Sequence, residues 1–213
     1  MFTSDGILLR RWRDGEAAIP GFLDDYAFYA QALLDLYETD FEQADRDLAV
    51  KLTGDMRRLF EDANNGGFFS TVEGDNRLVL RMKEDYDGAE PSGNSIAISN
   101  LLRLGDQETA ERALRAFTAT LERQTMTAPQ MVIALAASQR APQQIIFAGA
   151  RQQVQPLIDT AHRKFSPFRV LLLDPADHPE FTPVDGKPAA YVCENFICRL
   201  PVTDSSDLER LLT

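Results

Sequence analysis

The sequence predicts a mainly α fold with a minor β component, in which helical hairpins are followed by a βαβ unit near the C-terminal end. Two observations predict it. Apolar residues recur at i, i+3 and i+4 spacing in most segments between residues 22 and 139. After Pro142, two short apolar runs flank one helical segment, the pattern of a βαβ unit. We therefore expect two regions, residues 1–140 and residues 141–213.

The first region begins with a short hairpin or extended arm over residues 7–21, because Asp14-Gly15 is a turn pair. Helices are expected over residues 23–38 and 42–62, and the glycines of Asn64-Asn65-Gly66-Gly67 end the second. Two short strands, 68–72 and 77–81, are expected around a polar turn at 73–76. Three more helices are expected over 94–104, 107–124 and 129–139.

The second region is expected to contain a strand at 144–149, a helix at 150–163 and a strand at 168–173. A further strand at 187–193 and a capped helix at 203–212 complete it. Gly149 stands alone after the first strand, so the glycine fingerprint of dinucleotide-binding βαβ units is missing. We expect no bound nucleotide and no other cofactor.

Composition limits the possible partners. The 213 residues are 44% hydrophobic and 26% charged, the mix of a globular protein, and the formal net charge is −11. Nucleic acids and anionic lipid surfaces attract basic proteins, so neither is expected as a partner. The N-terminus does not have the pattern of a signal peptide, and no run of 18 apolar residues is present. The expected location is therefore cytoplasmic.

Cys193 and Cys198 are the two cysteines, too few for a disulfide scaffold. Their spacing differs from that of zinc-binding pairs and of C-x-x-C redox motifs, so no metal site is expected. On one extended strand the two side chains would point to opposite faces, and a bridge would need a turn at Glu194-Asn195. Unpaired structural thiols are the favoured expectation.

The stretch from Arg81 to Ser95 is the most site-like part of the chain, because it gathers charged and small polar residues in a loop that leads into a helix. Its carboxylates could serve as general acid and base or bind hydroxyl groups, while Asn94 and Ser95 could donate hydrogen bonds at the helix start. The alternative is a solvated turn at Asp87-Gly88 with Ser92 as an ordinary helix cap.

A second candidate lies at the start of the first helix, where Asp24 and Asp25 could divide acid and base roles if burial separated their pKa values. Plain helix capping is the competing interpretation. Together the two stretches give the candidate catalytic residues Asp25, Asp85 and Asp87. The candidate substrate-binding residues are Asp24, Arg81, Lys83, Glu90, Ser92 and Asn94.

Four motifs carry a resemblance to the C-terminal part of the spermatogenesis-associated protein 20 family. They are residues 21–28 (GFLDDYAF), 65–71 (NGGFFST), 83–95 (KEDYDGAEPSGNS) and 191–198 (YVCENFIC). Members of that family have a thioredoxin-like N-terminal domain followed by a large helical domain. That helical domain is similar to the (α/α)6 toroids of six-hairpin glycosidases and N-acylglucosamine 2-epimerases, which hold a sugar in a central cleft. The resemblance thus implies a partial toroid and a sugar ligand.

This chain departs from the resemblance in three ways. No thioredoxin-like domain is expected within these 213 residues, and the expected helices are too few to close a ring of six hairpins, so a partner chain or self-association is expected to complete it. The epimerases work with cleft histidines, whereas His162 and His178 lie in and after the βαβ unit, which does not support an epimerase mechanism. Two functions stay open, a sugar-binding or sugar-processing domain that uses its carboxylates, and a non-catalytic interaction scaffold.

Overall fold

The computed structural model describes residues 1–74, 78–140, 142–175, 178–194 and 197–212. Their fold is mainly helical with a minor β component, as the sequence predicts. The chain divides into two compact units. The first contains residues 1–37 and 42–139, and the second contains residues 38–41 and 140–213. Each unit is described by itself.

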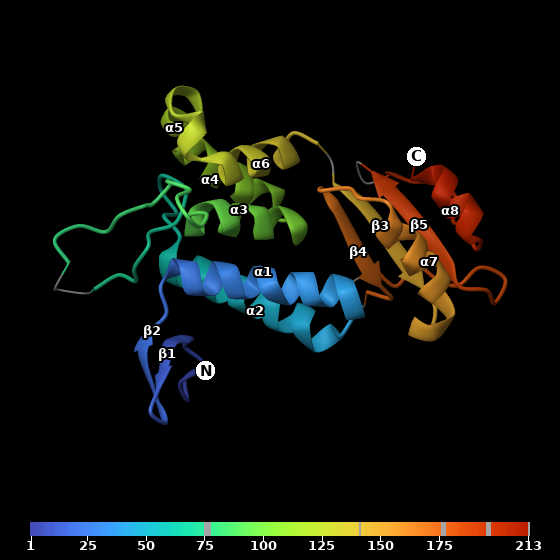
Figure 1. Ribbon diagram of the computed structural model, residues 1–213, viewed down its shortest axis with the longest axis horizontal. Coiled ribbons are helices and arrows are strands. Elements are labelled where there is room, and N and C mark those ends of the chain that lie inside the picture. The colour runs from blue at the N-terminus through green and yellow to red at the C-terminus, as the bar shows by residue number, and fades with distance from the viewer. Residues whose placement is uncertain (75–77, 141, 176–177, 195–196, 213) are drawn as a thin grey trace. The chain divides into compact units, whose positions relative to one another are not determined.

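The first unit is built from helices around a single apolar core. They are α1 (Leu23–Asp40, whose last turn belongs to the second unit), α2 (Gln43–Phe60), α3 (Gly93–Arg103), α4 (Gln107–Ala116), α5 (Thr118–Arg123), the 3-10 turn η1 (Thr125–Thr127) and α6 (Pro129–Ser138). Figure 1 shows α1 and α2 side by side. The rings of Tyr26 and Phe60 pack between them, with 5.4 Å between the ring centroids. The amide of Asn100 donates to the Ala27 carbonyl at 2.7 Å, which joins α3 to α1.

The N-terminal arm is a hairpin of β1 (Leu9–Arg13) and β2 (Glu16–Pro20), one of the two forms expected. Asp14 and Gly15 connect the strands with φ of 51° and 84°, as a tight hairpin turn requires. The hydroxyl of Tyr26 accepts the N–H of Leu8 at 3.0 Å. A core residue of α1 therefore holds the base of the arm.

The prediction of two strands over residues 68–72 and 77–81 is wrong. The described residues of the long loop (residues 69–92) contain no strand, and Asp75, Asn76 and Arg77 lie outside the described residues. Both polar backbone atoms of Phe68 bond to the Asn94 side chain, at 2.8 and 2.9 Å, so they are not available to a hairpin partner. The helix expected over residues 107–124 is also interrupted, because α4 ends at Ala116 and α5 starts at Thr118.

The second unit is a four-stranded sheet with two helices. Its strands β3 (Gln143–Ala148), β4 (Arg169–Leu173), β5 (Ala189–Glu194) and β6 (Ile197–Cys198) lie in the order β4-β3-β5-β6, and its helices are α7 (Arg151–Arg163) and α8 (Ser205–Leu211). β3 and β4 are parallel and connected through α7, which is the βαβ unit that the sequence predicts. β5 is antiparallel to both β3 and β6.

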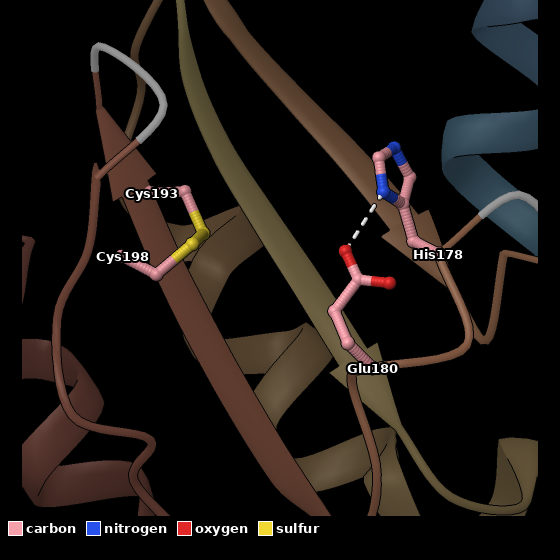
Figure 2. Close-up of a disulfide and its surroundings, with 4 residues drawn as sticks. All are labelled: His178, Glu180, Cys193 and Cys198. Carbon is pink, nitrogen blue, oxygen red and sulfur yellow. Dashed lines mark hydrogen bonds and ion pairs between the residues drawn. A yellow bond between two sulfur atoms is a disulfide. The ribbon is translucent and has the colours of Figure 1, made fainter.

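The prediction of unpaired thiols is wrong, because a disulfide joins Cys193 to Cys198 (Figure 2). The two cysteines lie on separate strands, and they face each other across the antiparallel β5–β6 ladder. Side chains directly opposite in such a ladder point to the same face of the sheet. The prediction failed because it treated residues 191–198 as one strand.

No helix in the described part of the chain is both long enough and apolar enough to cross a membrane.

Candidate functional site

Asp24 lies where α1, the long loop and α3 meet. It is in the first turn of α1, beside Leu23, whose N–H donates to the Ser70 carbonyl of the loop at 3.1 Å. Its carboxylate accepts the backbone N–H of Gly93, the first residue of α3. A Cβ at Gly93 would collide with Oδ1 of Asp24, so this approach requires glycine. The motif Ser92-Gly93-Asn94 thus brings α3 directly onto the carboxylate.

The surroundings of Asp24 favour its protonated form. Burial raises the pKa of this half-buried carboxyl above its usual 3.8, and the negative charges of Glu84, Asp25 and Glu90 raise it further. The hydrogen bond from Gly93 opposes the shift without cancelling it. Glu84 and Glu90 are themselves exposed. The arrangement is a carboxyl whose pKa is raised, near glutamate side chains that are open to solvent.

Asp25 closes the start of α1. Its Oδ2 accepts the N–H of Phe22 at 2.8 Å, and the Arg10 guanidinium lies 3.6 Å from the same oxygen. This is the capping geometry that competed with a catalytic role in the sequence. The catalytic role of Asp25 stays a prediction.

Asp87 connects the long loop to two helices. It is 9% exposed, and its Oδ1 accepts the N–H of Ser92 at 2.8 Å. Its Oδ2 accepts the N–H groups of Gln130 and Met131, at 2.8 and 3.2 Å, in the first turn of α6. A carboxylate there satisfies backbone donors that the helix itself leaves unpaired. Both oxygens of this candidate catalytic residue thus have structural partners, and its catalytic role stays a prediction.

Ser92 and Asn94 organise the start of α3. Ser92 is its N-cap and accepts the N–H of Ser95 at 3.2 Å. Asn94 is fully buried and binds both backbone groups of Phe68, while its amide also donates to the Glu84 carbonyl at 2.9 Å. Asn94 therefore fixes the backbone of Glu84, whose negative charge raises the pKa of Asp24. Contact of either residue with a substrate stays a prediction.

Lys83 pairs with a buried carboxylate that the sequence reasoning missed. Its ammonium lies 2.7 Å from Oδ2 of Asp62 and donates to the Gly66 carbonyl at 2.6 Å. The hydrogen bond from Lys83, with others from Asn65 and Asn64, holds the pKa of Asp62 well below its usual 3.8. The signal for Asp62 was present in the sequence, because Asp two residues before Asn commonly forms an Asx turn.

Arg81 lies on the ring of Phe69, with its guanidinium carbon 4.0 Å from the ring centroid, and it donates two hydrogen bonds to the Thr71 carbonyl. A cavity of about 570 Å³ opens here, lined by Arg81, Phe69, Gly74 and the apolar residues Val72, Leu78, Val79 and Leu80. None of the candidate carboxylates lines this cavity. Of the predicted substrate-binding residues, Arg81 alone borders it.

Asp85 accepts a hydrogen bond from the hydroxyl of Thr120 on α5. It therefore contacts a different element from Asp24, and its catalytic role stays a prediction. Among the described residues, no group of three or more His, Cys, Asp or Glu side chains is arranged to hold a metal ion. The chemistry this site can perform is proton transfer and hydrogen bonding by carboxyl groups.

No protein-family model matches this chain. Spermatogenesis-associated protein 20 of Homo sapiens is 38% identical over 213 aligned residues, which include 90% of this chain and 27% of that protein. The Rattus norvegicus protein of the same name is 36% identical, again over 90% of this chain and 27% of its own length. An uncharacterised protein of Caenorhabditis elegans is 33% identical over 92% of this chain and 29% of its own length. The chain thus spans little more than a quarter of the curated relatives that it matches.

Proposed function

The chain belongs to the spermatogenesis-associated protein 20 family, and from this premise we propose that it is a sugar-binding or sugar-processing part of a helical toroid, with its site at Asp24. The proposal combines the resemblance of the helical region to six-hairpin toroids with the chemistry available around this residue.

The observation that carries the proposal is the raised pKa of Asp24 beside the exposed carboxylates of Glu84 and Glu90. Enzymes that cleave or bind glycosidic groups divide the work between one carboxyl that keeps its proton and another that stays ionised. Burial and like charge are the two physical causes that separate such pKa values, and both act on Asp24. Asp24 would donate the proton, and Glu84 or Glu90 would accept one or bind a hydroxyl group.

The long loop adds a surface on which a sugar ring can rest. Tyr86 is 66% exposed, and its ring lies over Gly88, where a Cβ would come within 2.8 Å of the ring. Aromatic side chains provide an apolar face together with a polar hydroxyl group. A sugar has both apolar C–H faces and hydroxyl groups, which suits an exposed aromatic ring that carries a hydroxyl group.

A thermal-shift screen tests the proposal. Glucose, N-acetylglucosamine, maltose and cellobiose are added separately to the wild-type chain and to Asp24→Asn. A sugar at about ten times its Kd stabilises the folded state by about 1.4 kcal/mol and should raise Tm by about 3 °C. The shift should be lost in Asp24→Asn. It should persist in the control Asp47→Asn, which alters an exposed carboxylate near the other end of the helical hairpin.

One observation favours the alternative, an interaction scaffold. The long loop carries a short run of exposed apolar side chains: Leu78 (41% exposed), Val79 (104%), Leu80 (70%) and Met82 (56%). Apolar side chains gathered on one exposed segment are typical of a surface that another chain covers. If no sugar shifts the wild-type Tm and Val79→Asp abolishes self-association in sedimentation, the scaffold replaces the sugar site.

A further inference from the structure

The Cys193–Cys198 disulfide lies at the open end of the sheet in the second unit and has no part in the proposed sugar site. β6 is an edge strand of two residues, and it is joined to the rest of the sheet only along β5. Figure 2 shows the bridge crossing from β5 to the neighbouring strand. The disulfide therefore connects the last strand of the sheet to the one that supports it.

The two sulfur-bearing residues differ strongly in access. Cys193 is 4% exposed, whereas Cys198 is exposed, as are Ile197, Arg199 and Leu200 around it. A thiolate opens a disulfide by attacking one sulfur in line with the S–S bond, so access decides which sulfur is attacked. An incoming thiolate can approach Cys198, while the body of the unit covers Cys193.

The face of the sheet that bears the disulfide is not the face that packs on α7. Glu194, next to Cys193, accepts a hydrogen bond from the side chain of Gln143. Gln143 in turn accepts one from Arg169, which donates to the Ala161 and Lys164 carbonyls at the end of α7. Glu194 is thus linked to the face of the sheet that packs on α7. Adjacent residues of a strand point to opposite faces. Cys193 thus points away from α7.

The hairpin does not depend on the disulfide for its register. The N–H of Arg199 donates to the Val192 carbonyl at 2.9 Å, and Ala190 and Val202 exchange two backbone hydrogen bonds of 2.8 and 3.0 Å. The bridge also closes a loop of only five positions, which constrains the unfolded chain less than a long loop would. Opening it should leave both thiols facing each other, ready to rejoin.

We propose that Cys193–Cys198 is a reversible thiol–disulfide exchange site for a dithiol reductant, with Cys198 as the attacked sulfur and Cys193 as the leaving sulfur. A thiolate of the dithiol bonds to Sγ of Cys198, the S–S bond breaks, and Cys193 leaves as a thiolate that takes up a proton. The second thiol of the reductant then attacks its own sulfur in the mixed disulfide and releases Cys198 as a thiol. Two electrons pass to the protein, and the dithiol becomes a disulfide.

The test uses the full chain and dithiothreitol as the dithiol. Disulfide opening is followed by alkylation and mass spectrometry, and global unfolding is measured in the same buffer. The bond should open faster than the chain unfolds, at unchanged far-UV circular dichroism, and oxidised glutathione should restore it once the dithiothreitol has been removed. Opening only at the rate of unfolding, or failure to re-form, would overturn the proposal.

Two further measurements identify the attacked sulfur. With glutathione, a monothiol, peptide mapping of the trapped mixed disulfide should find it on Cys198, and this needs no variant. In single variants treated with a chromogenic disulfide, Cys193→Ser should react at least about tenfold faster than Cys198→Ser, because it retains the exposed thiol. Glutathione found on Cys193, or equal rates in the two variants, would refute the assignment.

Discussion

Replacing Asn94 with alanine tests whether this residue holds the long loop in place or mainly serves a ligand. Asn94 is fully buried, and its side chain makes three hydrogen bonds of 2.8 to 2.9 Å to the backbone of Phe68 and Glu84. Each contributes about 1 kcal/mol, and the buried N–H left without a partner costs about 1 to 3 kcal/mol more. We therefore expect Asn94→Ala to lower the free energy of unfolding by about 4 kcal/mol.

Urea denaturation followed by circular dichroism measures this loss, with the m value checked for constancy. Asn64→Ala is the matched control, because Asn64 is exposed on the turn after α2, and its replacement should cost less than about 0.5 kcal/mol. A residue kept for a substrate would be nearly neutral for stability. A loss below about 1 kcal/mol in Asn94→Ala would therefore refute the structural role assigned to its hydrogen bonds.

Three further predictions concern backbone strain and charge. Gly66→Ala should cost at least about 3 kcal/mol in urea denaturation, because its Cβ would collide with the Arg112 carbonyl at a φ of +77°. Gly105→Ala, at +82° in open space, should cost about 1 kcal/mol. Asp24→Asn should stabilise the fold at pH 7, because the raised pKa makes ionisation unfavourable; the gain should vanish as the pH falls to about 3.8. Asp62→Asn should destabilise the fold at pH 7, and this deficit should shrink as the pH falls below 3.8, because the lowered pKa keeps the wild-type carboxylate stabilising above that value.

The helices were largely predictable from the sequence. The apolar stripe that contains Tyr26, Leu33 and Tyr37 is buried in α1, and the stripe with Leu52, Met56 and Phe60 is buried in α2. These stripes repeat with the period of the helix itself, so the sequence needs no tertiary information to reveal them. The βαβ unit was predictable for the same reason, because its apolar runs are separated by a helical segment.

The long loop was not predictable, because its conformation is set by side chains far away in sequence. Residues 68–72 and 77–81 lie on either side of a polar turn, which suggests two strands. Yet the side chain of Asn94 bonds to the backbone of Phe68, and Arg81 and Lys83 lie over the ring of Phe69. Such contacts leave no periodic pattern. The sequence indicates Asp24 as a capping or acid–base carboxylate, but its raised pKa depends on burial and on the charges of Glu84 and Glu90, about 60 residues further on.

A 13C NMR titration of the side-chain carboxyl carbons tests the proposed role of Asp24, because it measures directly whether the pKa of this residue is raised. The midpoint of Asp24 should lie above 3.8, and it should be lower in Glu84→Gln, where one neighbouring charge is removed. A midpoint at or below 3.8 in the wild type, or no change in Glu84→Gln, would contradict it.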